Sequence, residues 1–156
     1  DLPAFGSDGL SARLIAGEAF GARSPVTTHS PLFYLHWTLQ AGATAELPAD
    51  YPERAAYVAD GMVEIDGREL HDGQMAVFAP GQTVALRALT AATVMLLGGE
   101  PVGPRFIEWN FGSSSKDRLE QAKADVLAGL LKWLVAVDKE FIPFPGDPRP
   151  SANPMS

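Results

Sequence analysis

The stretch from Gly42 to Ala88, GATAELPADYPERAAYVADGMVEIDGRELHDGQMAVFAPGQTVALRA, carries the most regular turn signals in this sequence. Glycines at positions 42, 61, 73 and 81 divide it, and Asp66-Gly67 is a dipeptide typical of a two-residue hairpin turn. Between these points lie short runs of apolar and β-branched residues, a pattern that indicates strands. The stretch therefore predicts several short antiparallel strands, with a type I′ turn at Asp66-Gly67 that joins two of them.

Strand signals continue on both sides of this stretch. Residues 31–40 alternate, and one face of the predicted strand carries Phe33, Leu35, Trp37 and Leu39. We expect that face to be core, so that His36 points away from it. Further strands are expected at residues 10–15, 43–47, 54–59, 75–78, 83–89 and 92–97, with the hairpin at 62–70. Strands at such regular spacing predict a barrel or a sandwich.

The frame of glycines resembles the two sequence motifs of cupins, which are small antiparallel β-barrels. In metal-binding cupins the first motif places two histidines and a glutamate between its glycines; here Pro48, Asp50 and Arg54 take those places. The second motif ends on a histidine, and Val84 stands there. Proline and valine cannot bind a metal ion, and an arginine would put a positive charge beside it. We therefore expect a cupin fold with no metal, no cofactor and no catalytic residue.

Longer segments resemble the carboxy-terminal half of the pirin family, whose members contain two cupin barrels. These segments are RLIAGEAFGARSPV, SPLFYLHWTLQAGA, LLGGEPVGPRFIEWNFGSSSKDRLEQAKAD and EFIPFP, and the likeness covers most of residues 10–145. The resemblance implies that the metal and the quercetinase-type dioxygenase activity of some members belong to the other half of the protein. The ligand motif of that half matches no positions here, so the resemblance supplies no catalytic residue.

The chain departs from the family pattern between Ala124 and Glu140, where it reads ADVLAGLLKWLVAVDKE. Ser114 and Asp117 resemble a capping box and predict a helix that begins near Ser115. If the helix reaches Val137 it is about 33 Å long. Gly129 would then lie in mid-helix, where glycine costs about 1 kcal/mol relative to alanine.

The apolar residues of this predicted helix form an arc wider than the ~100° stripe that packing on one barrel face requires. We assign Val126, Leu130, Trp133 and Val137 to the barrel. The remaining side of the arc, which we expect to meet another chain, carries Leu127, Leu131 and Leu134. The alternative is that the helix lies in a groove and buries both flanks. An engineered origin would also account for such an apolar block.

Composition limits the classes of function. The chain has 156 residues, a length typical of one domain, and no cysteine, which excludes disulfides and Cys-rich metal sites and fits a reducing compartment. We therefore predict a cytoplasmic protein. A net charge of -7 with scattered basic residues argues against nucleic acid as a partner. No apolar run reaches the ~18 residues of a membrane-spanning helix, so we expect no membrane partner.

The expected organisation follows from these patterns. Residues 1–9, rich in Pro, Gly and Asp, look like a linker, and residues 10–111 form the barrel. Residues 112–145 contain the helix and a closing segment, and residues 146–156, dense in Pro and Ser, form a mobile tail. The chain opens on Asp1 without a basic-then-apolar leader, so we expect a processed or recombinant fragment rather than a secretory precursor.

We interpret the chain as mainly β, a cupin-type antiparallel β-barrel with one long carboxy-terminal α-helix. In this interpretation it has no chemistry of its own and acts as a scaffold or association module, and its partner is a protein, either another chain or a second copy. One alternative is a part of a pirin-type dioxygenase whose catalytic half is absent. Another is a small-ligand binding barrel, with a lumen lined by His36, Trp37, Tyr57 and Met62.

A further alternative is an enzyme that needs no metal. Acidic residues near the expected barrel mouth could form a general acid and base pair there, because geometry decides such roles. The candidates are Glu46, Asp50, Glu53 and Glu64. Acidic residues on alternate strand positions are more typical of a solvated face.

Overall fold

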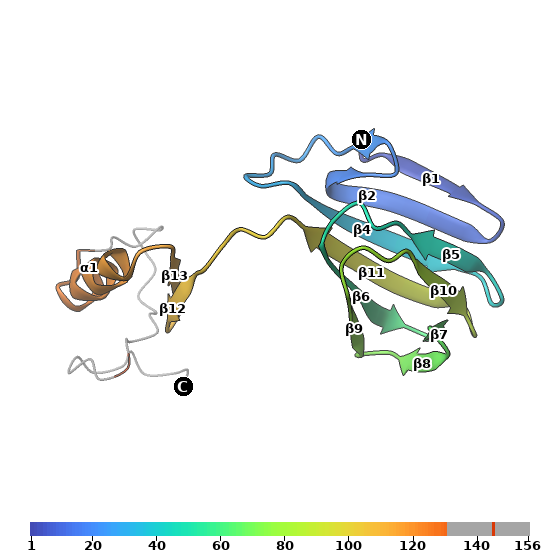
Figure 1. Ribbon diagram of the computed structural model, residues 1–156. Coiled ribbons are helices and arrows are strands. Elements are labelled where there is room, and N and C mark those ends of the chain that lie inside the picture. The colour runs from blue at the N-terminus through green and yellow to red at the C-terminus, as the bar shows by residue number, and fades with distance from the viewer. Residues whose placement is uncertain (131–144, 146–156) are drawn as a thin grey trace, which may run out of the picture. The chain divides into compact units, whose positions relative to one another are not determined.

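The computed structural model describes residues 1–130 and residue 145. The chain divides into two compact units, Asp1–Val102 and Gly103–Ser156. The first unit holds the two larger sheets, and the second holds a short hairpin and a helix (Figure 1). This boundary lies earlier than the predicted one after residue 111, because the hairpin pairs with itself and contacts the helix.

The first unit consists of two antiparallel sheets. The seven-stranded sheet has the order β1-β2-β4-β11-β6-β9, with β3 attached to β2. Its strands are β1 (Ala4–Ser7), β2 (Leu10–Ala19), β3 (Ala22–Arg23), β4 (Leu32–Leu39), β6 (Glu53–Asp60), β9 (Met75–Phe78) and β11 (Ala92–Gly99). The four-stranded sheet has the order β5-β10-β7-β8. Its strands are β5 (Thr44–Leu47), β7 (Met62–Ile65), β8 (Arg68–His71) and β10 (Val84–Ala88).

One hydrophobic core lies between these two sheets. Alternate residues along each strand are buried, so each sheet turns one face to the core and the other to solvent. The predicted core face of β4 is confirmed, because Phe33, Leu35, Trp37 and Leu39 are all buried. The four-stranded sheet contributes Ala45, Leu47, Val63, Ile65, Val84, Leu86 and Ala88. The interior is filled with side chains, as in other small barrels.

The turn between β7 and β8 has the conformation that the sequence predicts. Asp66 and Gly67 have φ angles of 50° and 73°, and the strands pair directly up to them, Ile65 with Arg68. Positive φ at both central residues is the signature of a type I′ turn. The glycines at 42, 61, 73 and 81 also adopt positive φ, which explains why the frame of glycines marks the turns of this fold.

The amino-terminal segment differs from the prediction. Residues 1–9 were expected to be a linker, but residues 4–7 form β1, which pairs with β2 from Ala4 with Arg13 to Ser7 with Leu10. The Pro, Gly and Asp content that suggested a linker reflects the tight turn at Asp8-Gly9, where both residues have positive φ. Phe5 packs against the core from this strand.

The helix α1 (Lys116–Leu127) is shorter than predicted. Its N-cap is Ser115, one residue later than the expected Ser114, and the Ser115 hydroxyl accepts a hydrogen bond from the Arg118 N–H at 3.5 Å. At the other end Gly129 has a φ of 71°, and the N–H groups of Gly129 and Leu130 donate to the carbonyls of Val126 and Asp125. These two bonds form a Schellman motif, which ends a helix.

This helix end corrects the predicted helix that reaches Val137. Gly129 does not lie in mid-helix; it terminates the helix, because glycine adopts the left-handed conformation without steric cost. A single continuous arc along 126–137 is therefore wrong. Of the three residues expected to face a partner, Leu127 closes α1 and is exposed, whereas Leu131 and Leu134 lie outside the described residues. The predicted tail at 146–156 also lies outside them.

The second unit joins α1 to a hairpin of β12 (Phe106–Glu108) and β13 (Phe111–Ser113). Among residues 103–130 Leu119 is the buried one, and the Lys116 ammonium lies 5.0 Å from the centre of the Phe106 ring. The Lys123 ammonium donates to Glu108 at 2.9 Å, and this contact raises the pKa of Lys123. Within residues 1–130, no helix has the length and apolar character needed to cross a membrane.

Candidate functional site

Arg54 joins the two loops of the first unit that carry the cupin-motif places, and we call this region the mouth. This residue lies on β6 with its side chain turned inward, and it is only 2% exposed. Its Nη1 group donates to the carbonyls of Leu47 and Pro48 at 3.4 and 2.9 Å. Its Nη2 group donates to the carbonyls of Ala79 and Gln82 at 3.0 and 2.7 Å. The guanidinium therefore joins the loop after β5 to the loop between β9 and β10.

These four hydrogen bonds connect residues of the first cupin motif to residues of the second. Pro48 takes the first histidine place of one motif, and Ala79 belongs to the Pro-x-Gly part of the other. The planar guanidinium suits this task because it presents donors in several directions from a single residue. Within the described part of the chain, no carboxylate forms an ion pair with Arg54. Among the described residues, four backbone carbonyls accept hydrogen bonds from the guanidinium, and its Nε atom has no partner there.

The residues at this mouth do not fit a metal ion. Arg54 places a permanent positive charge where a cupin would hold its glutamate ligand, and the nearest oxygens already accept bonds from the guanidinium. Val84, at the second-motif histidine place, is a core residue that pairs with Leu47. In the described ranges, no three His, Asp or Glu side chains cluster in a way that could hold a metal.

The four residues expected to line a lumen lie on different faces. Trp37 is buried in the core, where its ring centre lies 6.1 Å from that of Phe20. His36 and Tyr57 lie on the opposite, outer face of the same sheet, where both pair with Met95. Met62 begins β7 in the other sheet and is half-buried. Because these four residues lie on different faces, they do not line a common cavity.

The acidic residues also lie outside the mouth. Glu46 and Glu64 alternate with buried residues on β5 and β7, which places them on the outer face of the four-stranded sheet. Glu53 precedes the inward-facing Arg54 and lies on the outer face of the other sheet, and Asp50 is exposed. The structure therefore corrects the alternative of an acid and base pair in the mouth, because these carboxylates do not converge.

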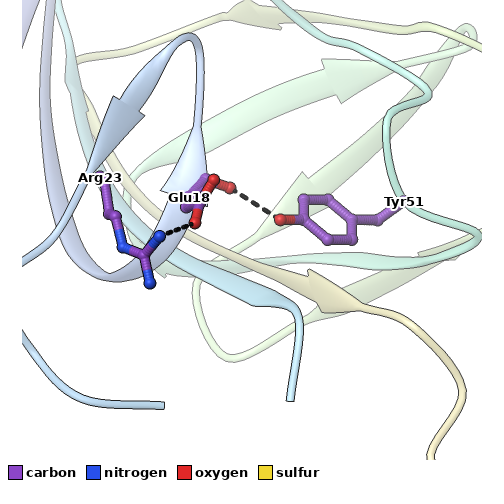
Figure 2. Close-up of polar contacts among 3 residues, drawn as sticks. All are labelled: Glu18, Arg23 and Tyr51. Carbon is purple, nitrogen blue, oxygen red and sulfur yellow. Dashed lines mark hydrogen bonds and ion pairs between the residues drawn. The ribbon is translucent and has the colours of Figure 1, made fainter. Parts of the chain in front are cut away.

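A polar cluster that the sequence did not indicate ties a loop to the β2–β3 hairpin (Figure 2). The Tyr51 hydroxyl donates to the carbonyl of Glu18 at 3.1 Å, and the Glu18 carboxylate pairs with Arg23 at 2.8 Å. The Tyr51 ring packs 5.4 Å from that of Phe33. Burial raises the pKa of Tyr51, and nearby carboxylates, that of Glu18 first, raise it further. The ion pair is exposed, so it adds little stability.

Across β4, β11, β6 and β9 the outer face of the seven-stranded sheet carries two rows of uncharged residues, which we call the outer apolar face. Strand pairing places Tyr34, Leu97, Ala55 and Val77 side by side in one row. It places His36, Met95, Tyr57 and Met75 in the next. On β2 the exposed Arg13 pairs with His36 and ends the second row. At one end the face opens into a groove of about 910 Å³, whose lining includes Leu32, Pro52, Val77 and Val102.

The sequence held a signal for this face that the strand predictions passed over. Met75-Ala76-Val77-Phe78 and Val94-Met95-Leu96-Leu97 are continuous apolar runs, not alternating ones. Continuous runs are typical of strands that are covered on both faces. Here the second face is exposed in the structure, with Met75 at 52% and Val77 at 79%.

Comparison with known sequences identifies the family. Residues 34–131 match the profile of the pirin C-terminal cupin domain. The chain belongs to the pirin family. This confirms both the predicted family and the predicted fold, a mainly β cupin with a carboxy-terminal helix.

Several relatives place this pirin domain within longer proteins. A pirin-like protein of Caulobacter vibrioides is 68% identical over 145 residues, which is 93% of this chain and 50% of that protein. A pirin-like protein of Solanum lycopersicum is 26% identical over 83% of this chain and 47% of that protein. A crystal structure of quercetin 2,3-dioxygenase from Acinetobacter baumannii has a TM-score of 0.78 and 25% identity, covering 86% of this chain and 49% of that chain. The chain spans about half the length of these relatives.

Proposed function

We propose that this chain is a non-catalytic cupin domain that acts as a scaffold for a second protein domain. The observation that carries the proposal is Arg54, which takes the place of a metal ligand and is hydrogen-bonded to both mouth loops. Its permanent positive charge opposes the binding of a metal ion, and so opposes the chemistry that a metal would supply at this place. We therefore assign this domain the role of binding and supporting a second protein domain.

The length of the relatives supports this role. The Caulobacter pirin-like protein has as much chain again beyond the matched part. The Acinetobacter protein, named a quercetin 2,3-dioxygenase, is also matched over about half its chain. If this chain forms part of a protein with such an activity, the residues at its cupin-motif places support a reaction in the other half. The role of this domain would then be to associate with that other half.

Metal analysis tests the proposal. The chain is incubated with Fe²⁺, Mn²⁺ and Cu²⁺ in turn, passed over a gel-filtration column and analysed for metal per chain. We expect far less than one metal ion per chain, and no flavonol oxidation above buffer in a parallel assay. The Acinetobacter quercetin 2,3-dioxygenase is the positive control for that assay. Stoichiometric metal that survives gel filtration, or flavonol turnover by the chain alone, would overturn the proposal.

A further inference from the structure

The groove at the end of the outer apolar face has the size and the walls of a small-molecule site. Its volume of about 910 Å³ lies within the range of about 300–1,000 Å³ that is typical of such sites. Four prolines contribute to its walls, Pro31, Pro52, Pro80 and Pro101. Proline has a fixed φ angle and no N–H group, so these walls are stiff and poor in backbone donors. The described lining residues all belong to the first unit, so one compact body forms the groove.

The surface that the groove offers to an occupant is largely apolar. Val77 and Leu97 contribute aliphatic side chains from the sheet, and Val102 contributes another from the segment after β11. All three side chains are exposed, and so is the ring of Tyr34 beside them. Exposed apolar surface gathered in a groove is typical of a ligand site, because covering it removes that surface from water.

The exposed charges of the groove are negative. Glu53 and Glu100 are exposed members of its lining, and the residues that line it include no lysine. The one arginine among them is Arg54, which is 2% exposed and donates its hydrogen bonds to backbone carbonyls. Its guanidinium therefore offers no exposed positive group to an occupant. The charge of the groove is complementary to a cation.

The negative charge extends beyond the rim of the groove. Tyr51 packs its ring 5.4 Å from that of Phe33, which is a lining residue. Burial raises the pKa of Tyr51, and nearby carboxylates, that of Glu18 first and that of Glu100 among them, raise it further. Arg23 pairs with Glu18 and offsets that charge, whereas Glu100 belongs to the groove itself.

We propose that this groove binds a small organic cation, a molecule with an apolar body and an ammonium group. The apolar body lies against Val77, Leu97 and the proline walls, and the ammonium lies at the rim beside the carboxylates of Glu53 and Glu100. The ring of Tyr34 adds to the attraction, because the face of an aromatic ring attracts a cation. This binding is a second function of the domain and does not depend on the scaffold role proposed above.

The test uses two fluorescent probes that differ in charge. Dansylcadaverine carries an apolar dansyl group and an ammonium at the two ends of a pentamethylene chain, and dansyl-aminohexanoate replaces the ammonium with a carboxylate. Each probe is titrated into the whole chain at neutral pH, where dansyl emission reports apolar surroundings and calorimetry gives the stoichiometry. The groove variants are Glu53→Gln, Glu100→Gln and Val77→Lys. The matched controls are Glu46→Gln and Val26→Lys, which make the same changes at exposed positions that do not line the groove.

We expect one molecule of dansylcadaverine per chain and at least about tenfold weaker binding of the carboxylate probe, because like charges repel at the rim. Each groove variant should weaken dansylcadaverine by at least about threefold, and the controls should bind it as wild type does. Equal binding of the two probes, equal effects of groove and control variants, or no binding at all overturns the inference. Each of these failures leaves the scaffold role in place, since metal analysis tests that role separately.

Two further outcomes would assign the groove to another occupant. A dimer of the wild-type chain that binds no probe and that Val77→Lys dissociates would assign it to a second copy. A wild-type chain that binds no probe, and whose melting temperature falls more with Val77→Lys than with Val26→Lys, would assign it to the chain's own residues. Either result, measured by light scattering and thermal melting, overturns the inference.

Discussion

Arg54 carries a full charge in a place where a charge is costly. Its guanidinium is buried, forms no ion pair with any carboxylate of residues 1–130, and depends on the carbonyls of Leu47, Pro48, Ala79 and Gln82. Hydrogen bonds that involve a charged group contribute about 1.5–3 kcal/mol each, and a buried group that loses its partner costs about 1–3 kcal/mol. This residue should therefore matter more to stability than an average core position.

We expect Arg54→Met to lower the free energy of unfolding by at least about 3 kcal/mol, because it removes all four hydrogen bonds at once. Arg54→Lys should fall between this variant and wild type, since one ammonium keeps the charge but cannot reach both loops. Arg87→Met, on the exposed face of β10, is the matched control and should change stability by about 0.5 kcal/mol or less. Urea unfolding measures all three; equal midpoints for Arg54→Met and Arg87→Met would contradict the role of Arg54.

Tyr51 makes stability depend on pH at the alkaline end. Its pKa in the folded chain lies above the ordinary 10.0, because burial and the charges of Glu18, Asp50 and Glu100 oppose the phenolate. Above pH 10 the unfolded chain therefore loses this proton first, and stability falls as pH rises. We expect wild type to lose more unfolding free energy between pH 9.5 and pH 11 than Tyr51→Phe, in urea titrations. Parallel losses in the two proteins would show that Tyr51 does not contribute.

The elements of the fold owe much to local conformation, and the β7–β8 hairpin shows this most directly. Gly67 has a φ of 73°, and a Cβ built on it meets no atom within 4 Å. Any cost of substitution there is therefore conformational strain and not a clash.

We expect Gly67→Val to lower the unfolding free energy by about 1 kcal/mol or more, because a β-branched residue fits the left-handed region poorly. Gly67→Asn is the control and should cost less, since asparagine tolerates that region. Thermal melting of the three proteins measures the effect. An unchanged melting temperature for Gly67→Val would mean that the turn tolerates other conformations.

At the scale of the whole molecule, two features stand out: a buried arginine that joins two loops, and a sheet face with exposed apolar residues. Arg54 takes the place of the glutamate ligand of metal-binding cupins. On the outer apolar face, Met75 and Val77 are exposed. The chain spans about half the length of its pirin-like relatives. Both features support the association role that we propose.

The sequence by itself determined most strands of the first unit and the hairpin turn, because these depend on neighbours along the chain. Alternation along residues 31–40 identified the core face, and Asp66-Gly67 identified the turn. Local geometry also explains the error in the length of the helix, since Gly129 was counted as a helical residue although glycine more often ends a helix. From the motif, the sequence indicated only that Arg54 would oppose the binding of a metal ion.

Only the tertiary structure decided what Arg54 does and where the exposed apolar residues gather. The four carbonyls that hold its guanidinium lie up to 28 residues away in sequence, and no local pattern reports such partners. The outer apolar face depends on strand order, because β4, β11, β6 and β9 become neighbours only when the sheet assembles. Tyr34, Leu97 and Val77 are separate apolar residues in the sequence. Cross-strand pairing makes them one surface.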